Sequence, residues 1–184
     1  MKPLRVAQFG HPVLRATARQ VPAKDIKNPE MKRLIKSIRE LLYKRELGVA
    51  MAAPQVGESV ALVVVSIRPL KHRKDVEPFE AVLINPEITE TFGRKAQLYE
   101  GCISGGPGKA ALFAKVPRYK KVRVKYYDEN GTRHEKTFEG LKAQIMQHEI
   151  DHLHGTLFVD RVTDTLSYVS YAEYIKLTKQ TPKR

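Results

Sequence analysis

The sequence predicts a single α+β domain in which mixed or antiparallel β-sheets and hairpins pack around a central helix. An amphipathic helix near the N-terminus is followed by several short β-branched runs and a hairpin, and a second helix comes only after them. Because helices and strands are segregated along the chain, an α+β arrangement is favoured over alternating βαβ units. The length of 184 residues is typical of one domain.

The first helix is predicted to begin at Asn28 and Pro29, since asparagine caps a helix and proline suits its first turn. Gly48 is the predicted stop. Between them, apolar residues recur at helical spacing, namely Met31, Leu34, Ile35, Ile38, Leu41 and Leu42.

Short runs rich in β-branched residues predict the strands. Val60–Ile67 and Ala81–Ile84 read as buried strands, because glycine or proline bounds them. Val122–Tyr127 and Thr132–Phe138 read as a hairpin closed by an Asn130-Gly131 turn.

Helical patterns return in the last third of the chain. Residues 139–154 predict a helix that Gly155 ends, and a last helical stretch is expected near 165–179, before a basic tail. We expect a catalytic domain over residues 1–162 and a C-terminal helix with its tail over 163–184.

The composition says more about possible binding partners than about the activity. Lysine and arginine outnumber aspartate and glutamate by 33 to 20, and the resulting formal charge of +13 attracts polyanions such as RNA or the ribosome. The basic residues are spread along the chain, so we interpret them mainly as solvated surface and expect no sequence-specific nucleic-acid binding.

The single cysteine, Cys102, excludes an internal disulfide and fits a reducing compartment. No apolar run approaches the roughly 20 residues of a membrane-spanning helix, and the first ten residues lack the apolar core of a signal peptide. With 42% hydrophobic and 29% charged residues, these features favour a soluble, intracellular protein without a membrane partner.

The second helix contains the pattern His-Glu-x-x-His, with His148 and His152 four residues apart. Residues at that spacing differ by about 40° around a helix axis, so both imidazoles can reach one ion. The pattern also recurs by chance, and a helix histidine is often only a packed or surface group. The remaining histidines have no such companion and receive no role, namely His11, His72, His134 and His154.

A helical projection of residues 139–154 places Glu149 inside the apolar arc and Asp151 on the opposite, polar arc. Burying an unpartnered carboxylate costs on the order of several kcal/mol, so Glu149 needs compensation. A metal ion and its water would provide it, and they are what a general base requires. Asp151 is expected to be solvated or supporting rather than a ligand.

A catalytic metal site usually has three protein ligands, so two histidines leave one to find. Cys102 is the candidate, because it lies in the glycine-rich stretch 100–108, whose backbone can approach a ligand closely. A small packed side chain is the alternative reading of a lone cysteine, and it is less favoured in such a loop.

Three segments taken together resemble the peptide deformylase family. They are Gly48–Gly57 (GVAMAAPQVG), Glu100–Ser104 (EGCIS) and Gln147–Gly155 (QHEIDHLHG), and weaker similarity extends to about Val162. The resemblance implies a hydrolase that removes the N-formyl group from N-formylmethionyl ends of newly made polypeptides and releases formate. It also implies a location in the cytoplasm, or in an organelle of bacterial origin.

The resemblance implies that Cys102, His148 and His152 hold one divalent ion. A thiolate with two imidazoles suits zinc, iron, cobalt or nickel, so the donor set does not decide the element. The family likeness implies Fe²⁺ in cells, with Zn²⁺ as a frequent substitute and Ni²⁺ or Co²⁺ as further options.

For the chemistry, the resemblance implies Glu149 as general acid and base. It implies Gln55 and the backbone N–H of Ile103 as donors to the formyl oxygen, where negative charge develops. The residues that it places against the substrate are Val49, Ala50, Gly101 and Ile145.

The chain departs from the family pattern in the first and second motifs. Ala50 and Met51 stand where glycine and leucine are usual, and we expect the added methyl group at residue 50 to narrow the cleft. The stretch 105–115 looks lengthened, and no basic substrate contact is assigned in it.

Two alternatives remain open at this point. A divergent amidase or peptidase would use the same site on another acyl group. A basic ribosome-binding or RNA-binding protein with a structural metal would show salt-sensitive RNA affinity and no hydrolysis, although a structural site has no need of a buried base. The expected partners are nascent N-formylated polypeptides, with the ribosome surface as a further contact.

Overall fold

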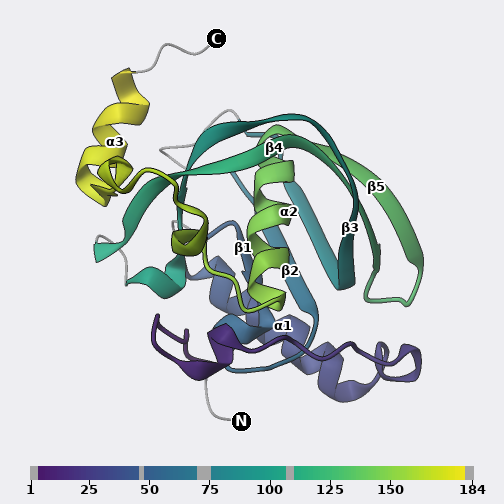
Figure 1. Ribbon diagram of the computed structural model, residues 1–184. Helices are drawn as coiled ribbons and strands as arrows, with labels where there is room; N and C mark the ends of the chain where they lie inside the picture. Colours follow the sequence, from purple (N-terminus) through teal and green to yellow (C-terminus); the bar gives the residue numbers. More distant parts are fainter. Residues whose placement is uncertain (1–3, 46–47, 70–75, 107–109, 181–184) are drawn as a thin grey trace.

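The computed structural model describes residues 4–45, 48–69, 76–106 and 110–180 (Figure 1). Short 3₁₀ turns join the main elements, and two of them, η3 (Ala53–Val56) and η4 (Ile103–Gly105), carry site residues. The helices are α1 (Pro29–Tyr43), α2 (Gly140–Leu153) and α3 (Tyr171–Gln180), and the strands are β1 (Ala50–Ala52), β2 (Leu62–Ile67), β3 (Phe79–Gly101), β4 (Leu112–Tyr127), β5 (Arg133–Glu139) and β6 (Val169–Ser170).

The strands pair antiparallel in the order β1-β2-β3-β4-β5, and β6 pairs with the beginning of β4. Three register shifts interrupt the pairing of β3 with β4, and such bulges bend and twist a strand. Figure 1 shows β3, β4 and β5 arching over α2, which stands in the middle of the molecule. The predicted α+β fold with a central helix is confirmed.

α2 is central because the curved sheet covers it on more than one side. Its residues Ile145, Met146 and Ile150 join a core with side chains of β1, β2, β4 and β5. The polar arc expected around Asp151 and Gln147 is also buried, at 8% and 6% exposure. The projection alone could not show this, because it describes the helix and not the sheet that wraps it.

α1 packs on the other face of the first strands. Met51, Leu62 and Val64 lie in a core with α1, while their sequence neighbours Ala52 and Val63 lie in the core with α2. This alternation is the period of two that a strand imposes on its side chains.

The predicted start of α1 is confirmed, since the Asn28 Oδ1 accepts a hydrogen bond of 2.7 Å from the Met31 N–H. The predicted stop at Gly48 is wrong, because the helix ends at Tyr43. Leu42 is the last buried residue of the helix, and Lys44 forms its C-cap.

Strand lengths differ most from the sequence prediction. β3 runs for 23 residues rather than ending near Ile84, and β4 begins ten residues before Val122. Much of the added length is charged and exposed, as in the ion pairs Glu87–Lys125 and Glu90–Arg123, with N–O distances of 2.8 and 2.6 Å. Apolar runs cannot detect such strands, since one of their faces is solvated.

The last helix begins later than predicted. Residues 165–167 form a 3₁₀ turn, the next residues form β6, and α3 starts only at Tyr171. The Asp164 carboxylate accepts a hydrogen bond of 3.0 Å from the Leu166 N–H, which favours a short turn over a continuous helix. Within the described ranges, no helix has both the length and the apolar character needed to cross a membrane.

Candidate metal centre

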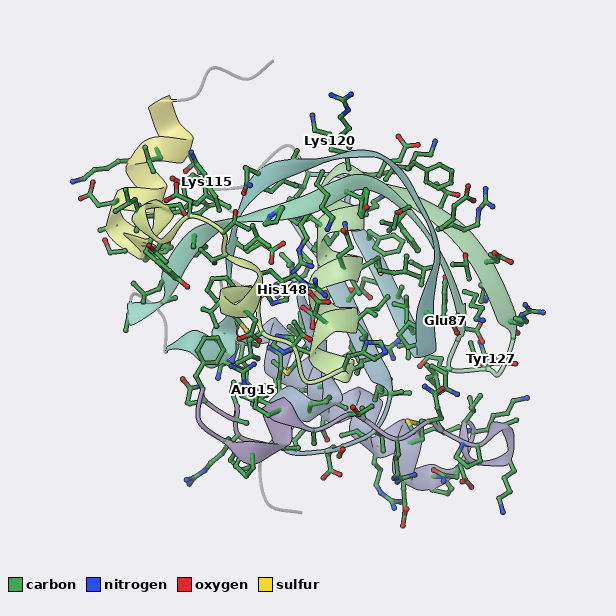
Figure 2. All side chains as sticks on the ribbon, in the orientation of Figure 1. Arg15, Glu87, Lys115, Lys120, Tyr127 and His148 are labelled. Atoms are coloured by element: carbon green, nitrogen blue, oxygen red, sulfur yellow. The ribbon has the colours of Figure 1, made fainter. Side chains whose placement is uncertain are left out.

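The three ligand candidates meet at one point of the fold. One ligand atom each from Cys102, His148 and His152 lies within 4.8 Å of the other two. The Cys102 Sγ is 3.3 Å from the His152 Nε2, and the two imidazole centroids are 5.0 Å apart. Figure 2 shows His148 on α2 in the middle of the molecule.

Local structure explains why these side chains converge. α2 places its two histidines one turn apart on the side that faces the end of β3. Cys102 follows the last residue of β3 and caps η4, where its Sγ accepts a hydrogen bond of 3.4 Å from the Ser104 N–H. The strand end and the helix turn therefore fix the thiol and the two rings against each other.

A buried charge network supports His148 from behind. The Glu100 carboxylate lies 3.0 Å from the His148 Nδ1 and accepts from it, which leaves Nε2 of that ring for an ion. Arg118 holds the same carboxylate with two hydrogen bonds, of 2.8 and 3.0 Å, and also donates to Asp151 over 2.6 Å. Arg161 completes the network by donating twice to Asp151.

The charge states in this network follow from its pairing. Burial alone would raise the pKa of Glu100, but His148 and Arg118 outweigh it and lower that pKa to about 2. Burial would likewise lower the pKa of His148, but the Cys102 thiol and Glu100 raise it well above its usual value. For His152, burial and the neighbouring His148 charge lower the pKa. The neighbours of His148 thus favour positive charge beside its ring, whereas the surroundings of His152 favour its neutral form.

Replacing Arg118 by methionine is expected to lower the free energy of unfolding by about 3–5 kcal/mol, because Glu100 and Asp151 lose a buried cation and keep only their bonds to His148 and Arg161. Arg118 is only 3% exposed. Chemical denaturation measures the loss. Arg123→Met is the matched control on the same strand, since its partly exposed ion pair with Glu90 is worth about 0–1 kcal/mol. Equal losses in the two variants would contradict this role of Arg118.

Gln55 approaches the centre from η3. Its Oε1 accepts a hydrogen bond of 2.8 Å from the Ala52 N–H, so its Nε2 points to the Cys102 Sγ and to the Ser104 Oγ, each at 3.4 Å. Gly57 closes η3 with a φ of 89°, a conformation that glycine adopts without strain. The amide is therefore held as a donor toward the centre.

Ile103 and Glu149 are the other two residues for which the sequence predicts a catalytic role. Ile103 is the first residue of η4, so its N–H lies at the start of a helical turn, directly after Cys102. Glu149 is 5% exposed, and burial raises its pKa to about 7, against the opposing effects of His148 and of a backbone hydrogen bond from Ala52. A carboxyl group with that pKa both accepts and releases a proton near neutral pH.

The residues fit a divalent transition metal ion. Sulfur and two imidazole nitrogens are a donor set that such ions prefer. In the described part of the chain, the buried Glu149 Oε2 beside these ligands has no hydrogen-bond partner. A polar atom left in this state in the interior indicates a site built for a further group.

A cleft of about 340 Å³ opens at this centre. All four residues predicted to contact the substrate line it, namely Val49, Ala50, Gly101 and Ile145. Of the two departures in the first motif, only Ala50 faces the cleft, because Met51 is fully buried against α1. The lengthened stretch 105–115 lies partly outside the described residues.

Sequence reasoning missed several residues of the site. It gave no role to Glu100 or Arg118, although Glu100 stands in one of the three segments that carry the family resemblance. It also missed the part of the cleft wall that comes from α3, including Tyr171 and Tyr174. The position of Glu100, two residues before Cys102, could have indicated a supporting carboxylate. Nothing in the sequence indicates that α3 lies at the cleft.

Comparisons with known proteins agree with this geometry. A model of the polypeptide deformylase family matches residues 3–167. The chain is 36% identical over 163 residues to a peptide deformylase of Leptospira biflexa, covering 88% of each protein. It is 41% identical over 159 residues to one of Chlorobaculum parvum, covering 86% of this chain and 79% of the relative.

Solved structures show the same likeness. A class I type b peptide deformylase from Acinetobacter baumannii with bound Met-Ala-Ser has a TM-score of 0.79 at 34% identity, covering 86% of this chain and 98% of that one. A peptide deformylase from Synechococcus elongatus in complex with actinonin has a TM-score of 0.76 at 38% identity, covering 91% and 82%.

Proposed function

Because the chain belongs to the peptide deformylase family and is therefore a metal-dependent hydrolase that removes N-formyl groups from nascent polypeptides, we propose that Cys102, His148 and His152 hold its metal ion. The observation that carries this assignment is the meeting of three ligand atoms within 4.8 Å, beside the cleft. The predicted family and activity are confirmed by the relatives. The roles of single residues are the proposal.

In the proposed mechanism, Glu149 moves the protons. An ion held at the three ligands would supply the chemistry of hydrolytic metal sites, in which the pKa of water is lowered and a carbonyl group is polarised. Glu149 accepts a proton from the attacking water and passes it to the departing amine, so water and formamide become formate and a free amino terminus. The pKa of about 7 suits this double task.

Two hydrogen-bond donors stabilise the charge that develops on the formyl oxygen. The Gln55 Nε2 is already aimed at the centre, because the Ala52 N–H holds the other end of the amide. The Ile103 N–H is the second donor. Donors fixed before the reaction are effective, because they need no reorganisation when charge appears.

The substrate is proposed to lie extended along β1. This strand is the first in the sheet order and pairs with β2 on one side, so an extended peptide can add to its other edge. Val49 and Ala50 then contact the backbone of the peptide, and Gly101 lines the opposite wall of the cleft. Ile145 of α2 packs against the methionine side chain.

The direct test is formate release from formyl-Met-Ala under anaerobic conditions, with acetyl-Met-Ala as the comparison. We expect kcat/KM to be at least about tenfold higher for the formyl peptide, since one added methyl group costs roughly tenfold or more in a closely fitting site. Equal turnover of the two peptides would support the divergent amidase instead. RNA binding without formate release would support the basic binding protein.

We propose Fe²⁺ as the resident ion, on the family likeness and on a donor set that iron accepts. The iron-loaded enzyme is expected to lose more than half of its activity after exposure to air, because Fe²⁺ and its thiolate ligand are both oxidisable. Enzyme loaded with Ni²⁺ or Zn²⁺ and treated in the same way serves as the control. Equal air stability of all three forms would argue against iron.

We further propose that the enzyme works in the compartment where formylated chains are made, the cytoplasm or an organelle of bacterial origin. Its substrate exists only at newly made N-termini, so the two must meet there. A formal charge of +13 favours transient contact with the ribosome surface. The division into a catalytic domain (1–162) and a C-terminal segment (163–184) stays a prediction.

A further inference from the structure

The C-terminal helix is held at the mouth of the cleft by strand pairing. Val169 and Ser170 of β6 pair with Phe113 and Leu112 at the beginning of β4, and α3 starts at the next residue, Tyr171. Figure 1 shows α3, in yellow, beside this part of β4. The first turn of α3 therefore has a fixed position relative to the strand that leads away from the metal centre.

One face of α3 lines the cleft. The residues that line it are Tyr171, Tyr174, Ile175 and Thr178. The last three follow Tyr171 by three, four and seven residues, so all four lie on one face of the helix. Glu173 and Lys176 lie outside this stripe, where they are exposed and form an ion pair of 2.7 Å. The helix thus presents an uncharged face to the cleft and its charges elsewhere.

An aromatic cluster connects this face to the metal centre. The Phe113 ring stacks on Tyr174 with centroids 4.1 Å apart, and Tyr99 meets Tyr174 edge-on at 5.8 Å. Phe113 also covers Gly101 so closely that a Cβ at residue 101 would come within 2.6 Å of the ring. Because Cys102 follows Gly101 directly, the cluster begins one residue from the proposed metal ligand.

We propose that α3 and Phe113 form a subsite for an apolar side chain of one of the two residues that follow the formylmethionine. This inference rests on the proposed function, in which the methionine packs against Ile145. An extended peptide advances about 3.3 Å per residue, so the residues after methionine reach the next part of the same cleft. There the aromatic and aliphatic lining favours an apolar side chain over a charged one.

Four formyl tripeptides test the subsite. Formyl-Met-Ser-Ser is the reference, and phenylalanine or aspartate replaces one serine in the others: formyl-Met-Phe-Ser, formyl-Met-Ser-Phe and formyl-Met-Ser-Asp. We expect one phenylalanine peptide to exceed the reference in kcat/KM by roughly three- to tenfold, the range of a single aromatic contact. The gain should appear in KM rather than kcat, since the subsite does not touch the reacting atoms. The aspartate peptide should show no gain.

Tyr174→Ala is expected to remove most of this preference, and Ile175→Ser, a smaller change on the same face, to reduce it. Glu173→Gln on the exposed face is the matched control and should keep the full preference. A preference that is absent in the native enzyme, or unchanged in both cleft-facing variants, overturns the subsite. Absence of formate release from any formyl peptide, including formyl-Met-Ala, contradicts the proposed function itself.

Discussion

Glu149→Gln is expected to lower kcat/KM for formate release by about 10²- to 10⁴-fold, the usual contribution of a general acid or base. Glutamine has nearly the same shape but cannot exchange a proton. Glu149 is 5% exposed, and its Oε2 has no hydrogen-bond partner among the described residues, so the substitution removes no ion pair. The metal content should stay at one ion per chain, as measured by elemental analysis.

Stability separates this explanation from a structural one. Because burying a carboxyl group is unfavourable, the melting temperature of Glu149→Gln should equal or exceed that of the native protein. Glu139→Gln, at an exposed position just before α2, is the control and should leave activity unchanged. Activity of Glu149→Gln within tenfold of native would rule out the proton-transfer role.

Gln55→Ala is expected to lower kcat/KM by about 10²- to 10³-fold, the typical loss of one oxyanion donor. The variant should still bind the metal, since its three proposed ligands are intact. It should also be less stable by about 0.5–1.5 kcal/mol, because the Ala52 N–H loses its hydrogen bond of 2.8 Å to the Gln55 Oε1. Kinetics, elemental analysis and chemical denaturation measure the three effects.

Gln55→Glu separates catalysis from support. The glutamate keeps an oxygen for the Ala52 N–H but has no N–H to donate to the formyl oxygen, so the rate loss should persist. If Gln55→Ala keeps full activity, the oxyanion role belongs to another donor. If Gln55→Glu restores the rate, Gln55 acts by holding η3 in place.

The sequence predicts the parts of the fold that depend on local chemistry. The cap at Asn28 lies where predicted, and the β4–β5 hairpin turns at the predicted residues. It does not predict the full length of β3 or the placement of α3. The length of β3 and the placement of α3 depend on pairing between distant residues and on charged strand faces. Neither feature produces an apolar pattern in the sequence.

The site shows the same division. The proposed ligand set and the proposed role of Glu149 follow from a motif on one helix and from a family likeness, so the sequence alone is enough to put them forward as predictions. The bond between Arg118 and Glu100 crosses from β4 to β3, and only the strand register brings the two side chains together. Asp151 was expected to be solvated or supporting, and its burial against Arg118 shows the supporting role.

The pairing of Gly101 with Phe113 also bears on how the chain tolerates insertions. β3 and β4 are hydrogen-bonded up to that pair, so the residues between them connect two points whose separation the sheet already fixes. Lengthening such a connection costs little, since the entropy of closing a loop grows only with the logarithm of its length. The part of this connection that follows η4 is therefore a place where evolution or protein engineering can add residues while Cys102 and Ile103 keep their positions.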